Sequence, residues 1–301
     1  DRCVIILLPT RINKPNSMQM KVIENIEELR EGLDSVVYSD RTVGFVPTMG
    51  ALHVGHTSLI DAAVDKADVV VVSIFVNPTQ FAPDEDFENY PRTLDSDLET
   101  CRTHEVDIVF APGVEQMYPE KNLTWVCVEG VTDLLCGANR PGHFQGVTTV
   151  CTKLFNIVRP DFAFFGQKDA QQAAVIKKMV KDLNMPLEIV VCPTVREQDG
   201  LAVSSRNKYL DPQQREDAVL LYKSLRKARE MIESGIKDID HIKKIMNDVL
   251  EKSDRITVEY IEIVDPDNIH RLHKLEGRVL IAIAARVGKA RLIDNILVDA
   301  G

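Results

Sequence analysis

The chain has 301 residues, 45% of them hydrophobic and 27% charged, so it is long enough for one large or two ordinary domains with proper cores. Its formal net charge of −10 argues against general nucleic-acid binding, and an anionic substrate would have to be attracted by a local cluster of cations. The longest apolar runs are only strand-sized, so we expect no transmembrane helix and no membrane partner.

The six cysteines form no C-x-x-C pair and no tight framework. In a chain of this size they indicate free, mostly buried thiols of a reducing compartment, which predicts a cytoplasmic protein. Residues 1–17, with Pro9, Pro15 and Asn16, are expected to form a disordered extension outside the fold. Its apolar run at 4–8 is too short for a signal peptide, and a leader, a tag and a transit-peptide remnant stay open as explanations.

In the first part of the chain, segments with a strand pattern alternate with segments of helical pattern. The expected strands are 42–47, 69–76, 108–111 and 162–165, and the expected helices are 24–33, 57–66, 93–104, 146–158 and 169–183. The nearly continuous β-branched run at 69–76 is typical of a strand buried on both faces of a parallel sheet. The alternation predicts a Rossmann-like, doubly wound α/β sheet, in which ligands bind beyond the carboxyl ends of the strands.

The pattern changes after Met185 and Pro186, where 187–191 is expected to be the last strand of this sheet. Two helices at 212–234 and 239–250 follow, the second with Asp238 placed as its N-cap. Successive strands at 258–264, 279–285 and 291–298 complete a small α+β unit. We therefore expect a Rossmann-like domain at 18–194 and a smaller C-terminal α+β domain at 195–301.

The run His53-Val54-Gly55-His56 stands where an apolar strand ends and a helix begins. A helix N-terminus attracts anions, and Gly50 and Gly55 would let a phosphate approach the backbone closely. Two histidines at this spacing could also be ordinary surface residues or half of a metal site. Because no acidic third ligand follows at i+4, the sequence favours a phosphate site over a metal site.

Polar clusters follow three of the expected strands. These clusters are 47–49 (Pro-Thr-Met), 77–80 (Asn-Pro-Thr-Gln) and 166–169 (Gly-Gln-Lys-Asp). Carboxyl ends of parallel strands share one edge of the sheet, so the three clusters are expected to meet in one crevice. The acidic stretch at 84–90 is either a mobile flap or a surface loop, and the sequence slightly favours the loop.

Individual side chains in and near these clusters suit an anionic substrate. Lys168 can reach phosphates as a point charge, although a single lysine is more often simply solvated. Asp169 is suited to cap the following helix, or else to bind ribose hydroxyls. Arg206 offers a guanidinium fork, in what is otherwise a polar turn. The neutral amides of Gln80 and Gln172 suit a hydroxy acid, with helix capping as the alternative.

Five motifs, in one order from about residue 20 to the C-terminus, resemble the pantothenate synthetase family of H-x-G-H nucleotidylyltransferases. They are 53–56 (His-Val-Gly-His), 77–81 (Asn-Pro-Thr-Gln-Phe), 140–144 (Arg-Pro-Gly-His-Phe), 166–169 (Gly-Gln-Lys-Asp) and 204–207 (Ser-Ser-Arg-Asn). The resemblance implies that ATP and pantoate form pantoyl adenylate and pyrophosphate. β-Alanine would then attack to give pantothenate and AMP, in the biosynthesis of pantothenate and coenzyme A.

The resemblance also implies roles for individual residues. The catalytic set would be His56, His53, Lys168 and Arg206. Residues of the ATP site would be Met49, Gly50, His53, Gly55, His56, Gly166, Gln167, Lys168, Asp169, Val195, Val203, Ser204, Ser205 and Arg206. Gln80, Gln172 and Asn77 would bind pantoate and β-alanine. The family implies Mg²⁺, carried mainly by the ATP phosphates with protein ligands unknown, and a homodimer whose C-terminal domain closes over the site. Val203 stands where relatives often have methionine.

Two other functions fit parts of this pattern. One is an adenylyl- or cytidylyltransferase that uses the same phosphate site with another acceptor, and the other is a non-catalytic nucleotide sensor. The two amides Gln80 and Gln172 favour a small hydroxy acid over a nucleotide acceptor, which would call for added cations. Both histidines, together with Lys168 and Arg206, favour an enzyme over a sensor.

Overall fold

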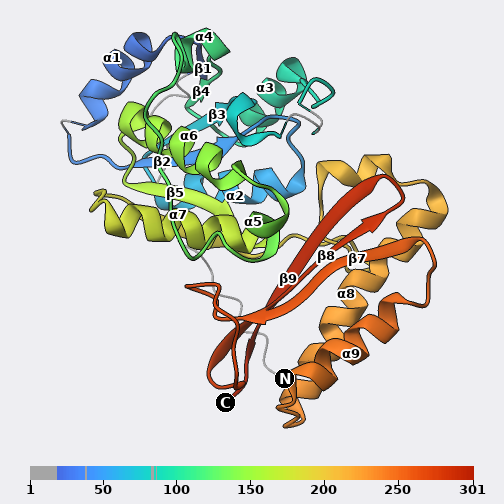
Figure 1. Ribbon diagram of the computed structural model, residues 1–301. Coiled ribbons are helices and arrows are strands. Elements are labelled where there is room, and N and C mark those ends of the chain that lie inside the picture. The colour runs from blue at the N-terminus through green and yellow to red at the C-terminus, as the bar shows by residue number, and fades with distance from the viewer. Residues whose placement is uncertain (1–18, 38, 83–84, 86) are drawn as a thin grey trace, which may run out of the picture.

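The computed structural model describes residues 19–37, 39–82, 85 and 87–301. The extension expected at 1–17 lies outside these residues. Figure 1 shows a larger α/β lobe, which carries one sheet, and a smaller lobe in which a second sheet lies between two long helices and the larger lobe. Within the described residues, no helix is both long and apolar enough to cross a membrane.

The larger lobe contains the predicted parallel sheet, which has six strands where the sequence indicated five. The six strands are β1 (Lys21–Ile23), β2 (Val43–Thr48), β3 (Val69–Ile74), β4 (Ile108–Phe110), β5 (Phe162–Gly166) and β6 (Glu188–Cys192). The spatial order β1-β4-β3-β2-β5-β6 places later strands on both sides of β2. The sheet is therefore doubly wound, with the reversal of strand order at β2. The short edge strand β1 was not predicted, because its three residues carry almost no periodicity.

Helices cover both faces of this sheet (Figure 1). They are α1 (Ile26–Val37), α2 (Val54–Lys66), α3 (Leu94–Thr103), α4 (Val114–Met117), α5 (Leu135–Asn139), α6 (His143–Val158) and α7 (Ala170–Asp182). Side chains alternate along the strands, so that Val71 packs with α1, α6 and α7, whereas Val72 packs with α2 and α3. The run at 69–76 is thus buried on both faces, as its β-branched composition predicted.

Two helices begin earlier than the apolar pattern indicated. α2 begins at Val54 with His53 as its N-cap, and α6 begins at His143 rather than at residue 146. The sequence pattern missed these first turns because their residues are mostly polar or glycine. Three short 3₁₀ turns, η1 (Pro78–Gln80), η2 (Gln167–Asp169) and η3 (Ser205–Tyr209), carry motif residues that the pattern left as loops.

The smaller lobe consists of α8 (Pro212–Glu233), α9 (Ile239–Leu250) and the strands β7 (Ile256–Val264), β8 (Arg278–Val287) and β9 (Ala290–Asp299). The strands form an antiparallel sheet in the order β7-β8-β9. One face of β8 packs on the two helices through Ile281 and Ile283. Its other face packs on α7, where Leu280 and Ala282 join Val175 in a separate buried cluster. The smaller lobe therefore shares an apolar contact with the larger one.

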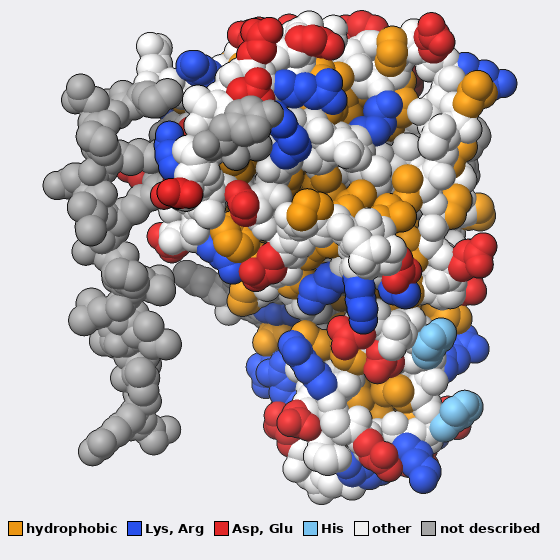
Figure 2. All heavy atoms as spheres, turned by 90° about the vertical axis from the view of Figure 1, so that its left-hand side faces the viewer, with side chains coloured by type: hydrophobic (Ala, Val, Ile, Leu, Met, Phe, Trp, Pro, Cys, Tyr) orange, Lys and Arg blue, Asp and Glu red, His pale blue; other side chains and the backbone are white. Residues whose placement is uncertain are grey.

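Two local predictions about the chain are supported here. Asp238 is the N-cap of α9, since its carboxylate accepts a hydrogen bond of 3.0 Å from the backbone N–H of His241. All five described cysteines are free thiols, and Cys127 is the exposed one among them. Figure 2 shows acidic and basic side chains interspersed over one face, so the attraction of an anion depends on local cations.

Candidate active site

The two histidines of the H-x-G-H run cap α2 in a reciprocal way. His53 accepts the backbone N–H of Gly55 at Nδ1 (3.1 Å), and His56 accepts the backbone N–H of His53 at Nδ1 (3.3 Å). The ring centroids lie 4.1 Å apart. Because each Nδ1 is an acceptor, the proton of each neutral ring is on Nε2. Both imidazoles thus line the crevice as hydrogen-bond donors.

Both imidazoles are held in the neutral form. Burial, followed by repulsion from His53, lowers the pKa of His56 to about 3, although the carboxylate of Asp169 acts in the opposite direction. Burial and the positive charge of Lys168 also lower the pKa of His53. At neutral pH the positive charge on this side of the crevice therefore comes from Lys168 and not from the histidines.

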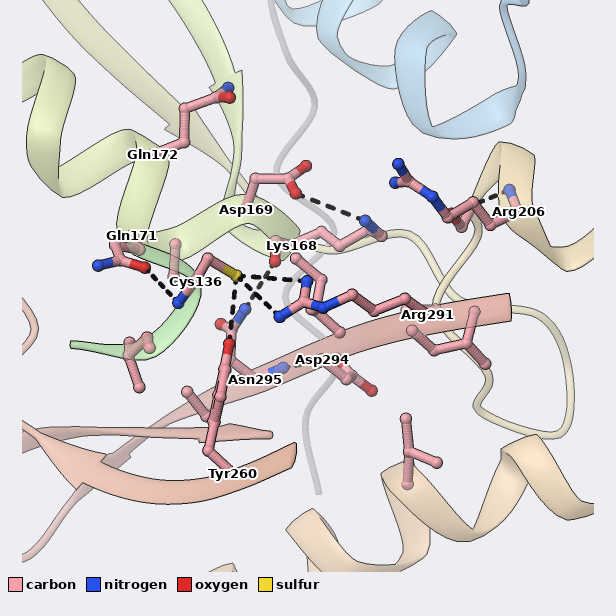
Figure 3. A pocket seen from close by; sticks show the side chains of 18 of the residues that line it. Cys136, Lys168, Asp169, Gln171, Gln172, Arg206, Tyr260, Arg291, Asp294 and Asn295 are labelled. Carbon is pink, nitrogen blue, oxygen red and sulfur yellow. Dashed lines mark hydrogen bonds and ion pairs between the residues drawn. The ribbon is translucent and has the colours of Figure 1, made fainter. Parts of the chain in front are cut away.

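Lys168 follows β5 in η2, with its Nζ 3.6 Å from Oδ1 of Asp169. Asp169 occupies the N-cap position of α7, but its side chain makes no capping hydrogen bond. The prediction that Asp169 caps this helix is therefore wrong, because the carboxylate lies beside the lysine instead. Figure 3 shows this ion pair and, across the pocket, the side chain of Arg206 extending from η3.

Asn295 of β9 holds the backbone of the Lys168 turn. Its Nδ2 donates to the carbonyl oxygens of Gln167 (3.0 Å) and Lys168 (2.9 Å), and its Oδ1 accepts from the Gln167 side chain (3.0 Å). The neighbouring Asp294 forms a bidentate ion pair with Arg196 at 2.6 and 2.9 Å. Strand β9 of the smaller lobe thus fixes the Lys168 turn through Asn295. Through Asp294 it also fixes Arg196, at the start of the segment that leads to Arg206.

A second contact between the lobes lines the same pocket (Figure 3). Arg291 of β9 donates to Sγ of Cys136 at 3.7 and 3.8 Å and to Glu259 at 2.7 Å. The hydroxyl of Tyr260 is 3.3 Å from the same sulfur. Cys136, Tyr260 and Arg291 thus line one pocket together with Lys168 and Arg206.

Gln80 is held by a buried asparagine. Asn77 is 1% exposed, and its Nδ2 donates to Oε1 of Gln80 (3.1 Å) and to the carbonyl of Gly146 (3.2 Å). Its Oδ1 accepts from the hydroxyl of Tyr118 (3.0 Å). Every polar atom of the Asn77 side chain thus has a partner, so we expect it to orient Gln80 rather than to bind a ligand directly.

The two adjacent glutamines of α7 differ in their surroundings. Gln172 lines the crevice together with Gln80. Gln171 is buried instead, with its Oε1 accepting from the backbone N–H of Cys136 (2.9 Å) and its Nε2 donating to two carbonyls. Figure 3 shows the two side chains lying apart. Only Gln172 is therefore placed to contact a ligand in this crevice.

The structure brings most of the predicted site residues together in one strand-end crevice. Those that line it are Met49, His53, His56, Asn77, Gln80, Lys168, Asp169, Gln172, Val203, Ser204, Ser205 and Arg206. The predicted residues that do not line it are Gly50, Gly55, Gly166, Gln167 and Val195. The meeting of the three clusters at one crevice follows from the parallel alignment of β2, β3 and β5.

Comparison with known proteins shows the family of this chain. The model of the family described as pantoate–β-alanine ligase matches residues 21–297. The chain belongs to the pantoate–β-alanine ligase family. Its reaction is the ATP-dependent condensation of pantoate with β-alanine, as the five motifs predicted.

Two curated relatives, both named pantothenate synthetase, come from Thermosipho africanus and Acetivibrio thermocellus. They are 56% and 52% identical, each over 93% of this chain and 100% of the relative. A Thermus thermophilus enzyme of the same name is 45% identical, with a TM-score of 0.88 over 92% of this chain and 99% of that chain. A Francisella tularensis pantoate–β-alanine ligase, solved with "Beta-gamma ATP and Beta-alanine", is 37% identical, with a TM-score of 0.77 over 93% and 98%.

Sequence reasoning missed the apolar wall of the crevice in this ligase. It is formed by Pro47, Phe75, Val147, Val150, Cys151, Leu154 and Phe165. Burial raises the pKa of the Cys151 thiol to about 12, so this side chain is a neutral, apolar part of the wall. In the sequence these residues could not be distinguished from ordinary core positions. Together with the amides of the same crevice, the wall suits a small acid with both apolar and hydroxyl groups.

Asp97 was also missed, although it shapes the turn before His53. It is 2% exposed and accepts the backbone N–H groups of Ala51 (2.9 Å) and Leu52 (2.8 Å). Gly50 has φ +80°, and an added Cβ would lie 3.0 Å from the Asp97 carboxylate. Gly50 is therefore required by the conformation of this turn and by the close approach of Asp97. A lone acid in a helix 46 residues away carries no sequence signal for such a role.

We predict that His56 makes the ligase sensitive to acid. The folded state resists protonation of His56, whereas the unfolded chain takes up that proton near pH 6.5, so stability is lost as the pH falls from 6.5 towards 3. Relative to pH 7, this single group should lower the unfolding free energy by about 2 kcal/mol at pH 5. In urea unfolding, the unfolding free energy of His56→Asn should fall correspondingly less between pH 7 and pH 5. Equal losses of unfolding free energy in the wild type and this variant would contradict the prediction. His270→Asn, which removes an exposed histidine, is the control and should behave like the wild type.

We also predict that Gly146→Ala displaces Gln80. An added Cβ would lie 2.3 Å from the carbonyl oxygen of Thr79 and 2.7 Å from Cα of Gln80, so α6 and η1 would have to separate. Such overpacking costs about 1–3 kcal/mol, and the KM for pantoate should rise with it. Gly32→Ala is the matched control, because its nearest neighbour is 3.8 Å away and it should be neutral or stabilising. A pantoate KM that does not change in Gly146→Ala would count against this placement of Gln80.

Proposed function

We propose that the strand-end crevice is the active site at which pantoate is adenylated and then joined to β-alanine. The observation that supports this most is that two neutral amides, Gln80 and Gln172, share one crevice with Lys168 and Arg206. Cations suit the phosphates of ATP, and amides suit a hydroxy acid. A site for phosphate alone would not need the apolar wall.

Lys168 and Arg206 would bind the phosphates, with Lys168 as a point charge and Arg206 as a planar fork. The hydroxyls of Ser204 and Ser205 would add neutral donors on the same side. By resemblance to the family, the remaining ATP contacts would come from Met49, Gly50, Gly55, Gly166, Gln167, Asp169, Val195 and Val203. Asn295 supports this assignment, because it fixes the backbone from which Lys168 extends.

Pantoate would lie between the amides and the apolar wall. Its two hydroxyl groups would pair with Gln80 and Gln172, and its two methyl groups would pack on side chains such as Val150 and Phe165. Asn77 would act through its hydrogen bond to Gln80. A buried amide that loses such a partner is costly, so this arrangement would discriminate against acids without hydroxyls.

The chemistry needs no nucleophile from the enzyme. A carboxylate oxygen of pantoate attacks the α-phosphorus, and the bond to the bridging oxygen breaks to release pyrophosphate. The amine of β-alanine then attacks the acyl carbon, AMP leaves with its phosphate oxygen, and the amine loses a proton to solvent. The neutral Nε2–H groups of His56 and His53 would donate to charge that develops on the phosphate oxygens, while the crevice positions both reactants.

We propose that Mg²⁺ enters the site with ATP. No group of three or more potential side-chain ligands lies together among the described residues, whereas the Asp169 carboxylate lines the crevice. Phosphate oxygens would then supply most of the ligands, with Asp169 the nearby protein carboxylate. The bound ion would neutralise phosphate charge and so lower the repulsion of the attacking carboxylate.

We further propose that residues 18–194 and 195–301 act as two domains in a cytoplasmic enzyme. The smaller part has its own sheet and helices, and it contributes Ser204 to Arg206 to one side of the crevice. That position would let it close over bound ATP and pantoate. The free thiols of Cys101, Cys151 and Cys192 support a reducing compartment.

A homodimer is proposed from the exposed segment at 122–128. Leu123 is 81% exposed and Trp125 is 41% exposed, on a stretch that belongs to no helix or strand. Large apolar side chains at such exposure mark association surfaces, and backbone that lies outside a sheet can pair with a second copy. We infer that this segment meets its counterpart in the partner subunit.

We predict that Lys168→Ala and His56→Ala fold normally but lose pantoate-dependent ATP–pyrophosphate exchange. Loss of one preorganised donor typically costs about 10²- to 10³-fold in kcat. Lys178→Ala, which removes an exposed lysine of α7, is the control and should exchange normally. Near-normal exchange by either site variant would refute its assigned role.

For the dimer, we predict that Leu123→Asp yields monomers. Sedimentation velocity would report the change, because a buried aspartate without a partner is strongly unfavourable at an interface. Leu183→Asp, at a 51% exposed position after α7, should leave the dimer intact. A Leu123→Asp variant that sediments like the wild type would place the interface elsewhere.

A further inference from the structure

The Arg-Pro-Gly-His run at 140–143 has no role in the proposed mechanism, yet two of its side chains line the active-site crevice. Arg140 and His143 both lie beside Gln80. They belong to the short connection between α5 and the start of α6. Their contacts are with the protein itself, and these contacts lead from the crevice to the segment at 81–90.

His143 holds the backbone of Gln80. Its Nδ1 lies 2.9 Å from the Gln80 carbonyl oxygen, and its Nε2 lies 3.0 Å from Nη1 of Arg140. Arginine can only donate, so Nε2 accepts and the ring proton is on Nδ1, where it is donated to Gln80. Burial, then the charge of Arg140, lowers the pKa of His143 to about 4, so this tautomer persists at neutral pH.

Gln80 is therefore fixed from two directions. Asn77 binds its side-chain amide, and His143 binds its backbone carbonyl. Nη2 of Arg140 adds a longer contact of 3.5 Å to the same carbonyl. With the side chain and the peptide plane both held, the amide of Gln80 has one orientation at the crevice. Removing the His143 donor would leave the Gln80 carbonyl with only the longer contact from Arg140.

Arg140 is in turn held by Glu85. Nε and Nη2 of the guanidinium each lie 2.6 Å from one carboxylate oxygen of Glu85, which is a bidentate pair. The two side chains are only 17% and 24% exposed, so solvent screens the pair weakly. Hydrogen bonding and charge from Arg140 outweigh burial and lower the pKa of Glu85, which keeps its carboxylate ionised.

Glu85 belongs to a segment that also forms part of the crevice. Phe81 and Tyr90 line it, and their ring centroids lie 5.8 Å apart. The only ionic contact of this segment with Arg140 is made by Glu85, among the described residues. The chain of contacts thus runs from Glu85 through Arg140 and His143 to the carbonyl of Gln80.

We propose that Arg140 and His143 are positioning residues that set Gln80 for pantoate, and that Glu85 acts on Gln80 through its ion pair with Arg140. The proposal rests on the assignment of Gln80 to pantoate. Neither Arg140 nor His143 takes part in the chemistry. Pantoate therefore binds well only when Glu85 is paired with Arg140.

The first test compares Glu85→Gln with Glu88→Gln, in pantoate-dependent ATP–pyrophosphate exchange by the full-length enzyme. Both variants remove one carboxylate charge from the same segment, but Glu88 is exposed and its carboxylate makes no ion pair among those of the described residues. Glu85→Gln should raise the KM for pantoate about 10-fold, as the loss of a charge-assisted pair implies, and leave the KM for ATP unchanged. Glu88→Gln should change neither.

The second test uses the geometry of the donor. The amide nitrogen of asparagine can take the place of Nδ1, whereas leucine fills similar space without a donor. His143→Leu should raise the pantoate KM, and His143→Asn should restore most of the loss. Circular dichroism confirms that both variants are folded. A merely structural role for His143 would show no such difference between a donor and an apolar side chain.

Two results would overturn the proposal. One is a pantoate KM in Glu85→Gln that equals that of Glu88→Gln, and the other is His143→Asn behaving like His143→Leu. A third variant, Gln80→Ala, shows which part of the proposal has failed. If Gln80→Ala raises the pantoate KM while the other variants do not, only the positioning of Gln80 by these residues is wrong. If Gln80→Ala leaves it unchanged, the assignment of Gln80 to pantoate fails and the positioning role fails with it.

Discussion

The active site depends on the parallel alignment of β2, β3 and β5, because parallel strands end at the same edge of a sheet. His53 follows β2, Asn77 follows β3 and Lys168 follows β5, although these residues are widely separated in the chain. The alternating burial of Val71 and Val72 on opposite faces fixes the strands between two layers of helices. The core and the crevice are therefore set by the same three strands.

The electrostatics of the crevice follow from how α2 begins. His53 and His56 satisfy backbone N–H groups at the helix terminus, and this use of Nδ1 leaves a neutral N–H donor on each ring. Burial then keeps both rings uncharged. In a chain of net charge −10, the positive charges that we assign to phosphate binding belong to Lys168 and Arg206, which come from different lobes. Both cations therefore line the crevice only when the two lobes are correctly placed.

The sequence predicted those features of the fold and the site that depend on local patterns. The β-branched run at 69–76 and the polar residues after each strand were enough for the sheet and the crevice, because strand burial and chain direction are local properties. Asn295 and Asp97 could not be predicted, since each acts on backbone atoms far away in the chain. Of the two roles considered for Asp169, the helix cap is wrong, because an ion pair with Lys168 competes for the same carboxylate. The role of Arg140 was equally hidden, because its partner Glu85 lies 55 residues earlier.

The packing of β8 against α7 has a consequence for how the chain unfolds. Leu280 and Ala282 of the smaller lobe cover Val175 of the larger one, and each lobe alone would expose this apolar surface to water. A fragment that ends near residue 194 would therefore lack part of its cover and tend to associate with other copies. We therefore expect a substitution that disrupts the shared cluster to lower the stability of both lobes.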